Sequence, residues 1–391
     1  MRPSAVSGPL SGITVIDLSR ILAGPYCTLM MAELGARVIK VEAPAKGDDA
    51  REYGPFVKGR SAYFMSINRG KESIVLDLKK PADRAVFEKL LAEADVLVEN
   101  FRPGTMEKLG YGWDSLHPKY PKLIYAAASG FGHTGPDSQR PAYDMVVQGL
   151  GGIMSVTGHP GGPPTRSGMS IGDIGAGLYT ALGVNAALFA RSQSGVGSKV
   201  DISMFDCQLA LLENAAMRYF VSGKAPGPLG ARHPSITPFE AFDTKTNPII
   251  IAAGNDGLFV KLAEALGRPD LAKDARFLTN DLRNQHVDVL KAEIEEVLRT
   301  QPVEHWMALL DKAGIPAGPI NTMKESLAHR QAAARNMVVT MTDPVCGPMK
   351  FVGNPVKVSG YPDPATRAPA PDLDGNRADI LKELGIEAKA S

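Results

Sequence analysis

Short runs of β-branched residues alternate with stretches of helical periodicity through the first part of the chain. Strands are predicted at residues 13–16, 38–41, 73–78, 96–100 and 123–127. A proline near its start marks a helix over residues 25–34. Strands that alternate with helices typically form a parallel sheet, because each return to the same edge of the sheet needs a long crossover. The pattern therefore predicts an α/β fold with a doubly wound sheet of the Rossmann type.

A long apolar stretch follows the predicted strands. Residues 171–190 are predicted to form a buried helix, residues 199–203 a strand and residues 204–221 another helix. Proline and glycine then interrupt every regular pattern at residues 222–238. Such a break in periodicity predicts a linker between two compact units.

A second unit follows this linker with patterns of its own. A strand is predicted at residues 248–253, and amphipathic helices are predicted at 283–299 and 303–313. Another stretch rich in proline and glycine begins at residue 314. The predicted division is a first unit at 1–221, a linker at 222–238, a smaller central α/β unit at 239–313, a return linker at 314–330 and a closing part at 331–391.

Charge and composition limit the classes of partner. Lys and Arg number 43 against 42 Asp and Glu, so the formal net charge of +1 gives no bulk field to attract nucleic acid or an anionic membrane. No apolar run approaches the ~20 residues of a membrane span, and the first residues lack the apolar core of a signal peptide. The chain is expected to be cytoplasmic, without nucleic-acid or membrane partners.

The chain has three cysteines that lack metal-ligand spacing, so no metal site is expected.

Motifs for nucleotide and metal chemistry are absent from the sequence. It has no Gly-x-x-x-x-Gly-Lys-[Ser/Thr] phosphate loop and no His-Glu-x-x-His metal helix. The first strand-to-helix turn, residues 19–25, has one glycine and lacks the dinucleotide fingerprint. These absences disfavour ATP and nicotinamide chemistry, and a nicotinamide oxidoreductase is kept only as an alternative.

Asp173 is the acidic residue that stands out, within residues 169–177 (MSIGDIGAG). It lies at the entrance to the predicted apolar helix, with glycines on both sides. One interpretation is a helix N-cap, because an aspartate there accepts backbone N–H bonds. The other is a carboxylate nucleophile that the glycines leave open to a substrate. The helix N-terminus would favour the ionised carboxylate in either case, so the residues alone leave both interpretations open.

Five stretches of sequence, taken together, carry the most specific signal. They are residues 17–25 (DLSRILAGP), 35–48 (GARVIKVEAPAKGD), 98–104 (VENFRPG), 142–144 (AYD) with the glycines that follow, and 161–177. They cover nearly the whole N-terminal half of the chain. In this order they resemble the class III CoA-transferases, the formyl-CoA transferase family.

The resemblance implies a fold of two domains. The N- and C-terminal parts of the chain would form one large Rossmann-like domain, and the middle would form the smaller α/β domain. Two such chains would be threaded through each other as an interlocked homodimer. The predicted linkers fall where this fold needs long connections.

The resemblance also implies that Asp173 is the catalytic nucleophile. Its carboxylate, expected to be ionised at neutral pH with an ordinary pKa of ~3.9, would attack the thioester of an acyl-CoA. An aspartyl anhydride and an aspartyl-CoA thioester would follow, and coenzyme A would pass to a free acid. No cofactor is expected to stay bound, because coenzyme A enters as a substrate thioester. Small dicarboxylic acids such as oxalate are the expected acceptors.

The family pattern further implies which residues contact coenzyme A. They are Leu22, Ala23, Leu76, Lys79, Asn100, Phe101, Arg102, Lys108, Arg140 and Tyr143. Arg102 and Lys108 would supply positive charge for phosphate groups. The sequence departs from the pattern at Ala43, where the family often has a basic residue. It also lacks the long glycine run that closes the active site of formyl-CoA transferase.

Two other functions stay open on the same fold. An acyl-CoA racemase would use a histidine where this chain has Tyr143, and a tyrosine with a pKa of about 10 is a poor base at neutral pH. A non-catalytic CoA-binding protein would be free to lose the carboxylate of Asp173. The CoA-transferase is therefore the preferred function, with an acetyl, formyl or succinyl donor.

Overall fold

A computed structural model describes residues 7–386 of the chain. They form two compact units. The first combines residues up to Met154, Arg166–Lys224 and residues from Arg330 onward, and the second combines Ser155–Thr165 with Ala225–His329. The second unit contains the central segment 239–313 and also most of the two stretches predicted as linkers. Residues 155–165, which the sequence analysis places in the first unit, belong to the second.

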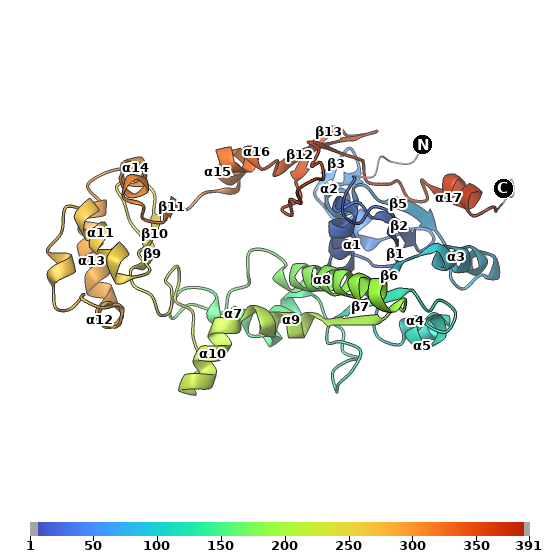
Figure 1. Cartoon of the computed structure of the whole chain (residues 1–391), viewed down its shortest axis with the longest axis horizontal. Coiled ribbons are helices and arrows are strands. Elements are labelled where there is room, and N and C mark those ends of the chain that lie inside the picture. The colour runs from blue at the N-terminus through green and yellow to red at the C-terminus, as the bar shows by residue number, and fades with distance from the viewer. Residues whose placement is uncertain (1–6, 387–391) are drawn as a thin grey trace. The chain divides into compact units, whose positions relative to one another are not determined.

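The first unit is built on a six-stranded sheet (Figure 1). Its strands are β1 (Thr14–Asp17), β2 (Arg37–Glu42), β5 (Glu72–Val75), β6 (Val96–Glu99), β7 (Ile124–Ser129) and β8 (Lys199–Ser203). The spatial order is β5-β2-β1-β6-β7-β8, and all neighbouring strands are parallel. The direction in which successive strands are added reverses between β1 and β6. The connections after these two strands therefore diverge and leave a crevice at the carboxyl ends of the strands. The predicted doubly wound parallel sheet is confirmed.

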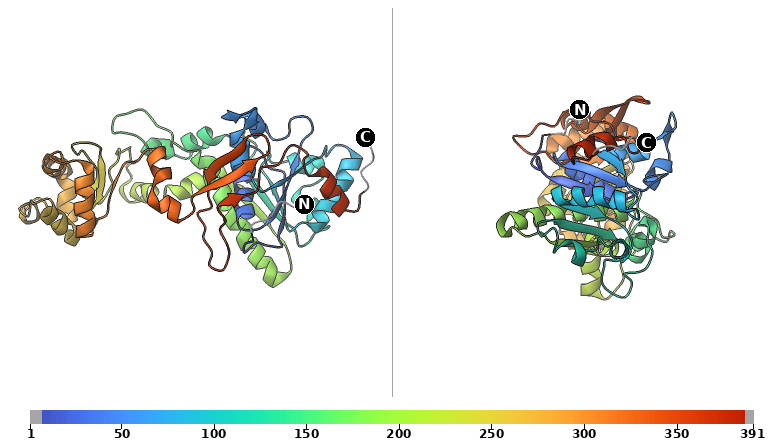
Figure 2. Two further views of the ribbon diagram at one scale, coloured as in Figure 1. Left: turned by 90° about the horizontal axis from the view of Figure 1, so that it is seen from above. Right: turned by 90° about the vertical axis from the view of Figure 1, so that its right-hand side faces the viewer.

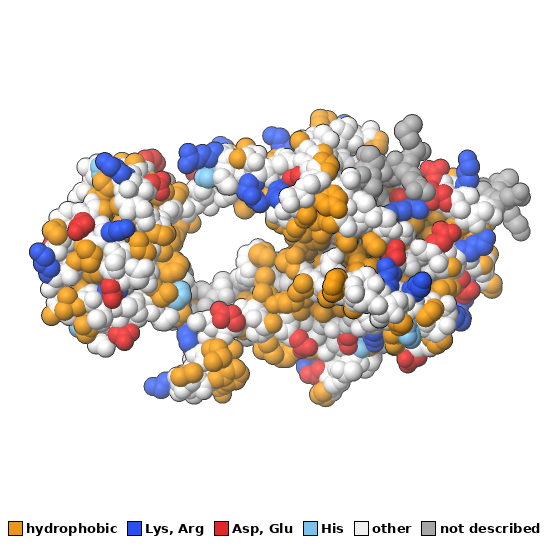
Figure 3. All heavy atoms as spheres, in the orientation of Figure 1, with side chains coloured by type: hydrophobic (Ala, Val, Ile, Leu, Met, Phe, Trp, Pro, Cys, Tyr) orange, Lys and Arg blue, Asp and Glu red, His pale blue; other side chains and the backbone are white. Residues whose placement is uncertain are grey.

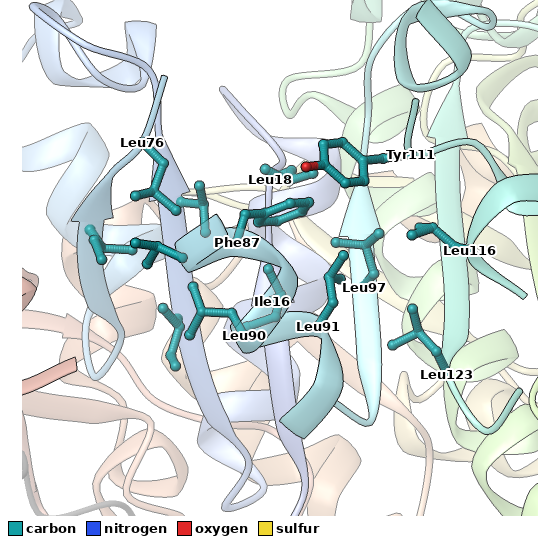
Figure 4. Packing of buried hydrophobic residues seen from close by; sticks show 14 of the residues in the cluster. Ile16, Leu18, Leu76, Phe87, Leu90, Leu91, Leu97, Tyr111, Leu116 and Leu123 are labelled. Carbon is teal, nitrogen blue, oxygen red and sulfur yellow. The ribbon is translucent and has the colours of Figure 1, made fainter. Parts of the chain in front are cut away.

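Helices cover both faces of this sheet. They are α1 (Ala23–Glu33) and α8 (Ile171–Ser194) on one face, and α3 (Pro81–Glu93), α4 (Thr105–Leu109), α5 (Trp113–Leu116) and α17 (Arg377–Glu383) on the other. Val15 of β1 belongs to the core under α1 and α8, whereas Ile16 packs with Phe87 and Leu97 under α3 (Figure 4). This period of two, with apolar residues on both faces, is typical of a buried parallel strand.

The C-terminal part of the chain returns to the first unit. Ile380 and Leu381 of α17 enter the core under α3, and the Nζ of Lys89 donates a hydrogen bond to the carbonyl of Leu384 at 3.0 Å. Figure 2 shows α17, in red, beside α3, in light blue. This unit therefore holds both ends of the described chain, and the burial of two large apolar side chains, at about 1.5–3 kcal/mol each, stabilises the return.

The other elements of the first unit are short. They are η1 (Asp49–Glu52), β3 (Phe56–Val57), β4 (Arg60–Ser61), α2 (Ala62–Asn68), α6 (Asp144–Leu150), α9 (Met204–Leu211), α10 (Glu213–Ser222), α16 (Arg330–Ala334), β12 (Val338–Asp343), β13 (Gly347–Val352) and β14 (Thr366–Arg367), with α7 (Ile153–Val156) at the boundary. The single helix predicted over residues 204–221 is wrong. The backbone of Leu212, with φ −87° and ψ 16°, leaves the helical region and separates α9 from α10.

The second unit packs helices against a small antiparallel sheet of order β11-β10-β9. Its elements are β9 (Phe239–Phe242), β10 (Ile249–Ala252), α11 (Asp256–Ala265), η2 (Leu271–Lys273), α12 (Asn280–Gln285), α13 (Val287–Leu298), α14 (Val303–Ala313), β11 (Ala317–Pro319) and α15 (Met323–Ala328). The predicted helix over 303–313 is confirmed. The one predicted over 283–299 is interrupted at His286, and β11 lies in the stretch predicted as the return linker.

α8 is long and apolar enough, by length and composition, to cross a membrane, although the sequence analysis expects no such span. A helix at the core of a soluble protein passes the same test. One side of α8, including Ala181, Val184 and Ala187, packs in the core shared with α1. Burial accounts for the apolar residues on this side of α8, whereas Leu182 and Phe189 of the same helix are exposed.

Candidate active site

The carboxyl ends of the parallel strands open onto a cavity of about 420 Å³ in the first unit, here called the Asp173 cavity. It lies at the switch point between β1 and β6, where doubly wound sheets bind ligands. Among the residues that line it are eight predicted site residues: Leu22, Ala23, Asn100, Phe101, Arg102, Arg140, Tyr143 and Asp173. Arg20, Ser129 and Met204, which the sequence analysis does not single out, line it as well.

A second cavity of about 370 Å³ continues along the same edge of the sheet, since it shares Arg20 and Phe101 with the first. The predicted residues Leu76 and Lys79 line it, together with Ala43 at the departure from the family pattern. Its other apolar lining comes from Leu18, Val41, Pro44, Leu78 and Leu109. Lys108 lies exposed on α4 and lines neither cavity.

Asp173 is the third residue of α8 and not its cap. Ser170 occupies the N-cap position, so the interpretation of Asp173 as a capping residue is wrong. Residues 168–172 also match the Gly-x-Ser-x-Gly pattern, but no strand precedes them, and the strand–turn–helix elbow of that motif is therefore not formed. Among the described residues no side-chain hydrogen bond of Asp173 is found, which leaves its carboxylate available to a ligand.

The surroundings of Asp173 raise its pKa. Burial, first, and the negative charge of Asp144, second, raise the pKa of Asp173 to about 7. The expectation of an ordinary pKa is therefore wrong, because desolvation and a like charge from elsewhere in the fold oppose the ionisation that a helix N-terminus favours. At neutral pH the carboxyl group is present in both protonation states.

Asp144 and two buried glutamines hold the turn that carries Asp173. The Oδ1 of Asp144 accepts a hydrogen bond from the backbone N–H of Gly172 at 2.8 Å, and its Oδ2 accepts one from the Nε2 of Gln148 at 2.7 Å. The Oε1 of Gln148 accepts from the N–H of Ser167 at 2.9 Å. From α9, the Nε2 of Gln208 donates to the carbonyl of Ile171 at 3.4 Å. Three contacts from α6 and α9, those to Gly172, Ser167 and Ile171, thus fix the start of α8, while the bond from Gln148 orients Asp144.

The glycines beside Asp173 have a packing role. A Cβ atom at Gly172 would lie 2.7 Å from Val147 and 2.9 Å from the Oδ1 of Asp144, and one at Gly177 would lie 2.7 Å from the carbonyl oxygen of Ala23. These distances are too short for a side chain. One of the two interpretations of the sequence has the glycines leave Asp173 open to a substrate; in the structure, Gly172 and Gly177 let α6 and α1 approach α8 closely.

The turn between β1 and α1, which lines both cavities, is held by side chains that are distant in sequence. Ile21 has a left-handed backbone with φ 67°, a strained conformation for a β-branched residue. Its N–H donates to the Oδ1 of Asp48 at 2.9 Å, and Asp48 pairs with Lys40 at 2.8 Å. The side chain of Asn100 bonds both the N–H and the carbonyl of Arg20, at 2.8 and 2.7 Å. Asn100, predicted as a CoA contact, thus also shapes the site.

Tyr63 is a neighbour of Asp173 that the sequence analysis missed. Burial and then the charge of Asp173 raise the pKa of Tyr63 to about 12, and Asp144 contributes in the same direction. The residue lies on α2, after a hairpin, and no local sequence signal distinguishes it. Asp48 and Asp144, by contrast, lie within the stretches that resemble the family and could have been assigned roles.

These features define the class of the protein: an α/β enzyme whose site lies at the switch point of a doubly wound sheet. The model of CoA-transferase family III matches residues 10–377, and the chain belongs to this family. It is 47% identical to the acetyl-CoA:oxalate CoA-transferase of Acetobacter aceti, over 99% of both chains. It is 40% identical to the succinate–glutarate CoA-transferase of Agrobacterium fabrum, over 96% of both.

Solved structures give the same result for the fold. A CAIB/BAIF family protein from Brucella suis has a TM-score of 0.84 and 40% identity, covering 97% of this chain and 100% of that one. A protein from Mycobacterium tuberculosis has a TM-score of 0.85 and 32% identity, covering 96% and 100%. The protein is therefore an enzyme of the CoA-transferase type, which makes a non-catalytic CoA-binding role the weaker alternative.

Proposed function

We propose that this enzyme moves coenzyme A from an acyl-CoA donor to a small dicarboxylic acid such as oxalate, through covalent intermediates on Asp173. The observation that carries the proposal is the carboxylate of Asp173, which lines the cavity at the switch point and has no hydrogen-bond partner among the described residues. A carboxylate held in this way is available as a nucleophile.

The proposed reaction has four steps. The ionised carboxylate of Asp173 attacks the thioester carbonyl. The C–S bond breaks, the CoA thiolate departs, and an anhydride between Asp173 and the donor acid is formed. The thiolate attacks the aspartyl carbonyl and releases the donor acid, which leaves an aspartyl-CoA thioester. The acceptor carboxylate attacks this thioester and releases the thiolate again. The thiolate finally takes the acceptor's acyl group from the second anhydride and regenerates Asp173.

Charge in the cavity supports an acidic ligand. Arg20, Arg102 and Arg140 line it, and guanidinium groups bind carboxylates and phosphates well. Relatives named as acetyl-CoA:oxalate, succinate–glutarate and succinyl-CoA:mesaconate CoA-transferases support a small dicarboxylic acceptor. For the adenine ring of coenzyme A we propose the second cavity, whose walls are largely apolar and whose lining includes Lys79.

The test is an exchange assay with the purified protein. Acetyl-CoA, formyl-CoA or succinyl-CoA is incubated with oxalate, glutarate or mesaconate, and the new acyl-CoA is measured. Transfer to a free acid supports the proposal. Epimerisation of a branched acyl-CoA without transfer would instead identify a racemase. If the protein catalyses neither transfer nor epimerisation, both functions are contradicted.

A trapping experiment tests the nucleophile. Hydroxylamine added after the donor should label Asp173, and a label on another acid would refute the role of Asp173 as the nucleophile.

The pH dependence of transfer follows from the environment of Asp173. Burial and the charge of Asp144 raise its pKa to about 7, so kcat/KM should increase between about pH 5.5 and pH 8 as the nucleophile ionises. Asp144→Asn removes a like charge and should lower the pH at which kcat/KM is half-maximal. The measurement is the pH profile of both proteins. A half-maximal value that stays the same in the variant would contradict this assignment.

We infer that the enzyme is an interlocked homodimer, as in the family it resembles. Apolar side chains on the first unit support an interface: Leu182 and Phe189 of α8 are 64% and 70% exposed, and Phe220 and Val221 of α10 are 73% and 83% exposed. Figure 3 shows hydrophobic side chains gathered over α10. Light scattering is expected to give twice the mass of one chain, and the mass of a single chain at micromolar concentration would contradict the dimer. The cytoplasmic location stays a prediction.

A further inference from the structure

Among the described residues, six buried side-chain atoms have no hydrogen-bond partner: Oδ2 of Asp48, Nδ1 of His117, Oγ of Ser129, Nε2 of His133, Oε1 of Gln208 and Oδ2 of Asp343. Ser129 is the one of these six that lines the Asp173 cavity. Buried polar groups in native proteins are almost always paired, so an unpaired hydroxyl at a ligand cavity needs an explanation.

Several of the other five atoms have charged neighbours. The Oδ2 of Asp48 lies 2.8 Å from the Nζ of Lys40, and the Oδ2 of Asp343 lies 3.3 Å from the Nε of Arg60. The Nε2 of His133 lies 3.7 Å from the Oε1 of Glu99. Ser129 has no ion pair, hydrogen bond or charged neighbour of this kind among the described residues. None of the described residues therefore serves as a partner for its hydroxyl.

The position of Ser129 is held by the sheet. It is the last residue of β7, its relative exposure is 5%, and it pairs in register with Ser203 of β8. The next residue, Gly130, approaches the segment just before α6 so closely that a Cβ atom would lie 2.5 Å from the Cβ of Ala142. The backbone at this strand end is therefore fixed on both sides, and only rotation of the side chain can redirect the hydroxyl.

We propose that Ser129 is a substrate-binding residue whose hydroxyl donates a hydrogen bond to an acyl or carboxylate oxygen of the ligand bound beside Asp173. This inference rests on the proposed function, because acyl-CoA thioesters and dicarboxylic acids both present such oxygens. Asp173 cannot serve them when it is ionised, since a carboxylate only accepts hydrogen bonds. The ligand thus supplies a partner that none of the described residues provides.

The inference predicts effects of opposite sign on stability and activity. Ser129→Ala removes a buried group that has no partner among residues 7–386, so the Tm of the free protein should rise by about 1–3 °C. The same change removes the hydrogen bond to the ligand, so kcat/KM for transfer should fall about tenfold. Ser129→Cys keeps a weaker donor of similar shape, so its kcat/KM should lie between those of the parent protein and Ser129→Ala.

Ser203→Ala is the matched control for stability. This serine is also buried and faces Ser129 in the register of β7 and β8, but its Oγ accepts the N–H of Asp206 at 3.1 Å and caps α9. Loss of a helix cap should lower the Tm, whereas Ser129→Ala should raise it. Equal changes in the two variants would show that the environment of Ser129 is not special.

The rise in Tm that acetyl-CoA and oxalate cause gives a readout that does not depend on turnover. It should be smaller in Ser129→Ala than in the parent protein. An unchanged ligand-induced shift with unchanged kcat/KM would overturn the role of Ser129, while transfer by the parent would leave the proposed function intact. If the parent shows no transfer, the proposed function fails, and the ligand-induced shift alone decides for or against Ser129. A lower Tm in free Ser129→Ala would also contradict the inference.

Discussion

Replacing Asp173 with asparagine is expected to lower CoA transfer by at least about 10⁴-fold, because the residue supplies the proposed nucleophile. Asparagine has nearly the same size, but its amide cannot form the anhydride. The measurement is the initial rate of transfer from acetyl-CoA to oxalate by the variant and the parent. A variant that keeps a rate within about tenfold of the parent would refute the nucleophilic role.

The same substitution should not destabilise the protein. A carboxyl group whose folded-state pKa of about 7 exceeds its unfolded value makes the folded protein bind more protons than the unfolded chain. Stability therefore falls as pH rises from about 4 to about 7, and asparagine escapes this loss. At pH 8 the Tm of Asp173→Asn should equal or exceed that of the parent. Asp114→Asn, the same change at an exposed position of α5, should leave both transfer and Tm near the parent values.

Lys71→Met is expected to have the largest effect on stability, a loss of about 3–5 kcal/mol, because it leaves a buried carboxylate without its closest cation. The Nζ of Lys71 lies 3.1 Å from the Oδ2 of Asp17, and both side chains are fully buried. The Nζ also donates to Thr28 at 2.7 Å and to Asn68 at 2.9 Å. Burial alone would raise the pKa of Asp17, but Lys71 and Lys40 outweigh it and hold the pKa below its ordinary value.

Denaturant unfolding of the parent and the variant measures this loss. Lys46→Met is the matched control, because Lys46 pairs with Glu52 at 2.9 Å on the surface, with side chains 71% and 55% exposed. A surface pair contributes about 0–1 kcal/mol, so this variant should stay close to the parent. The double variant Lys71→Met/Asp17→Leu should recover part of the stability, since it removes the unpaired charge. A loss below about 1 kcal/mol for Lys71→Met would contradict the argument.

Local patterns were sufficient to predict much of the fold. The β-branched runs predicted the strands of the parallel sheet to within a few residues, because a strand buried on both faces must be apolar along its length. Helix interruptions were harder. The breaks at Leu212 and His286 depend on the backbone conformation of a single residue each. The hydrophobic periodicity continues through both residues, so it does not reveal the breaks.

The candidate site shows a similar division. Resemblance to the family selected eight residues that the structure brings to one cavity. It did not select Ser129 or Tyr63, whose relevance depends on what lies around them in space. For Asn100 it suggested contact with coenzyme A, and the structure adds that this side chain holds the turn at Arg20, which is 80 residues away in sequence.

The sequence by itself determined the α/β class, the order of strands and helices, and Asp173 as the acid to consider, because periodicity and motif order are written locally along the chain. Only the tertiary structure decided the state of that acid. The pKa of Asp173 depends on burial and on Asp144, which bonds the turn at Gly172 from 28 residues away in sequence. Neither desolvation nor the charge of a residue distant in sequence can be read from the neighbours of Asp173 along the chain.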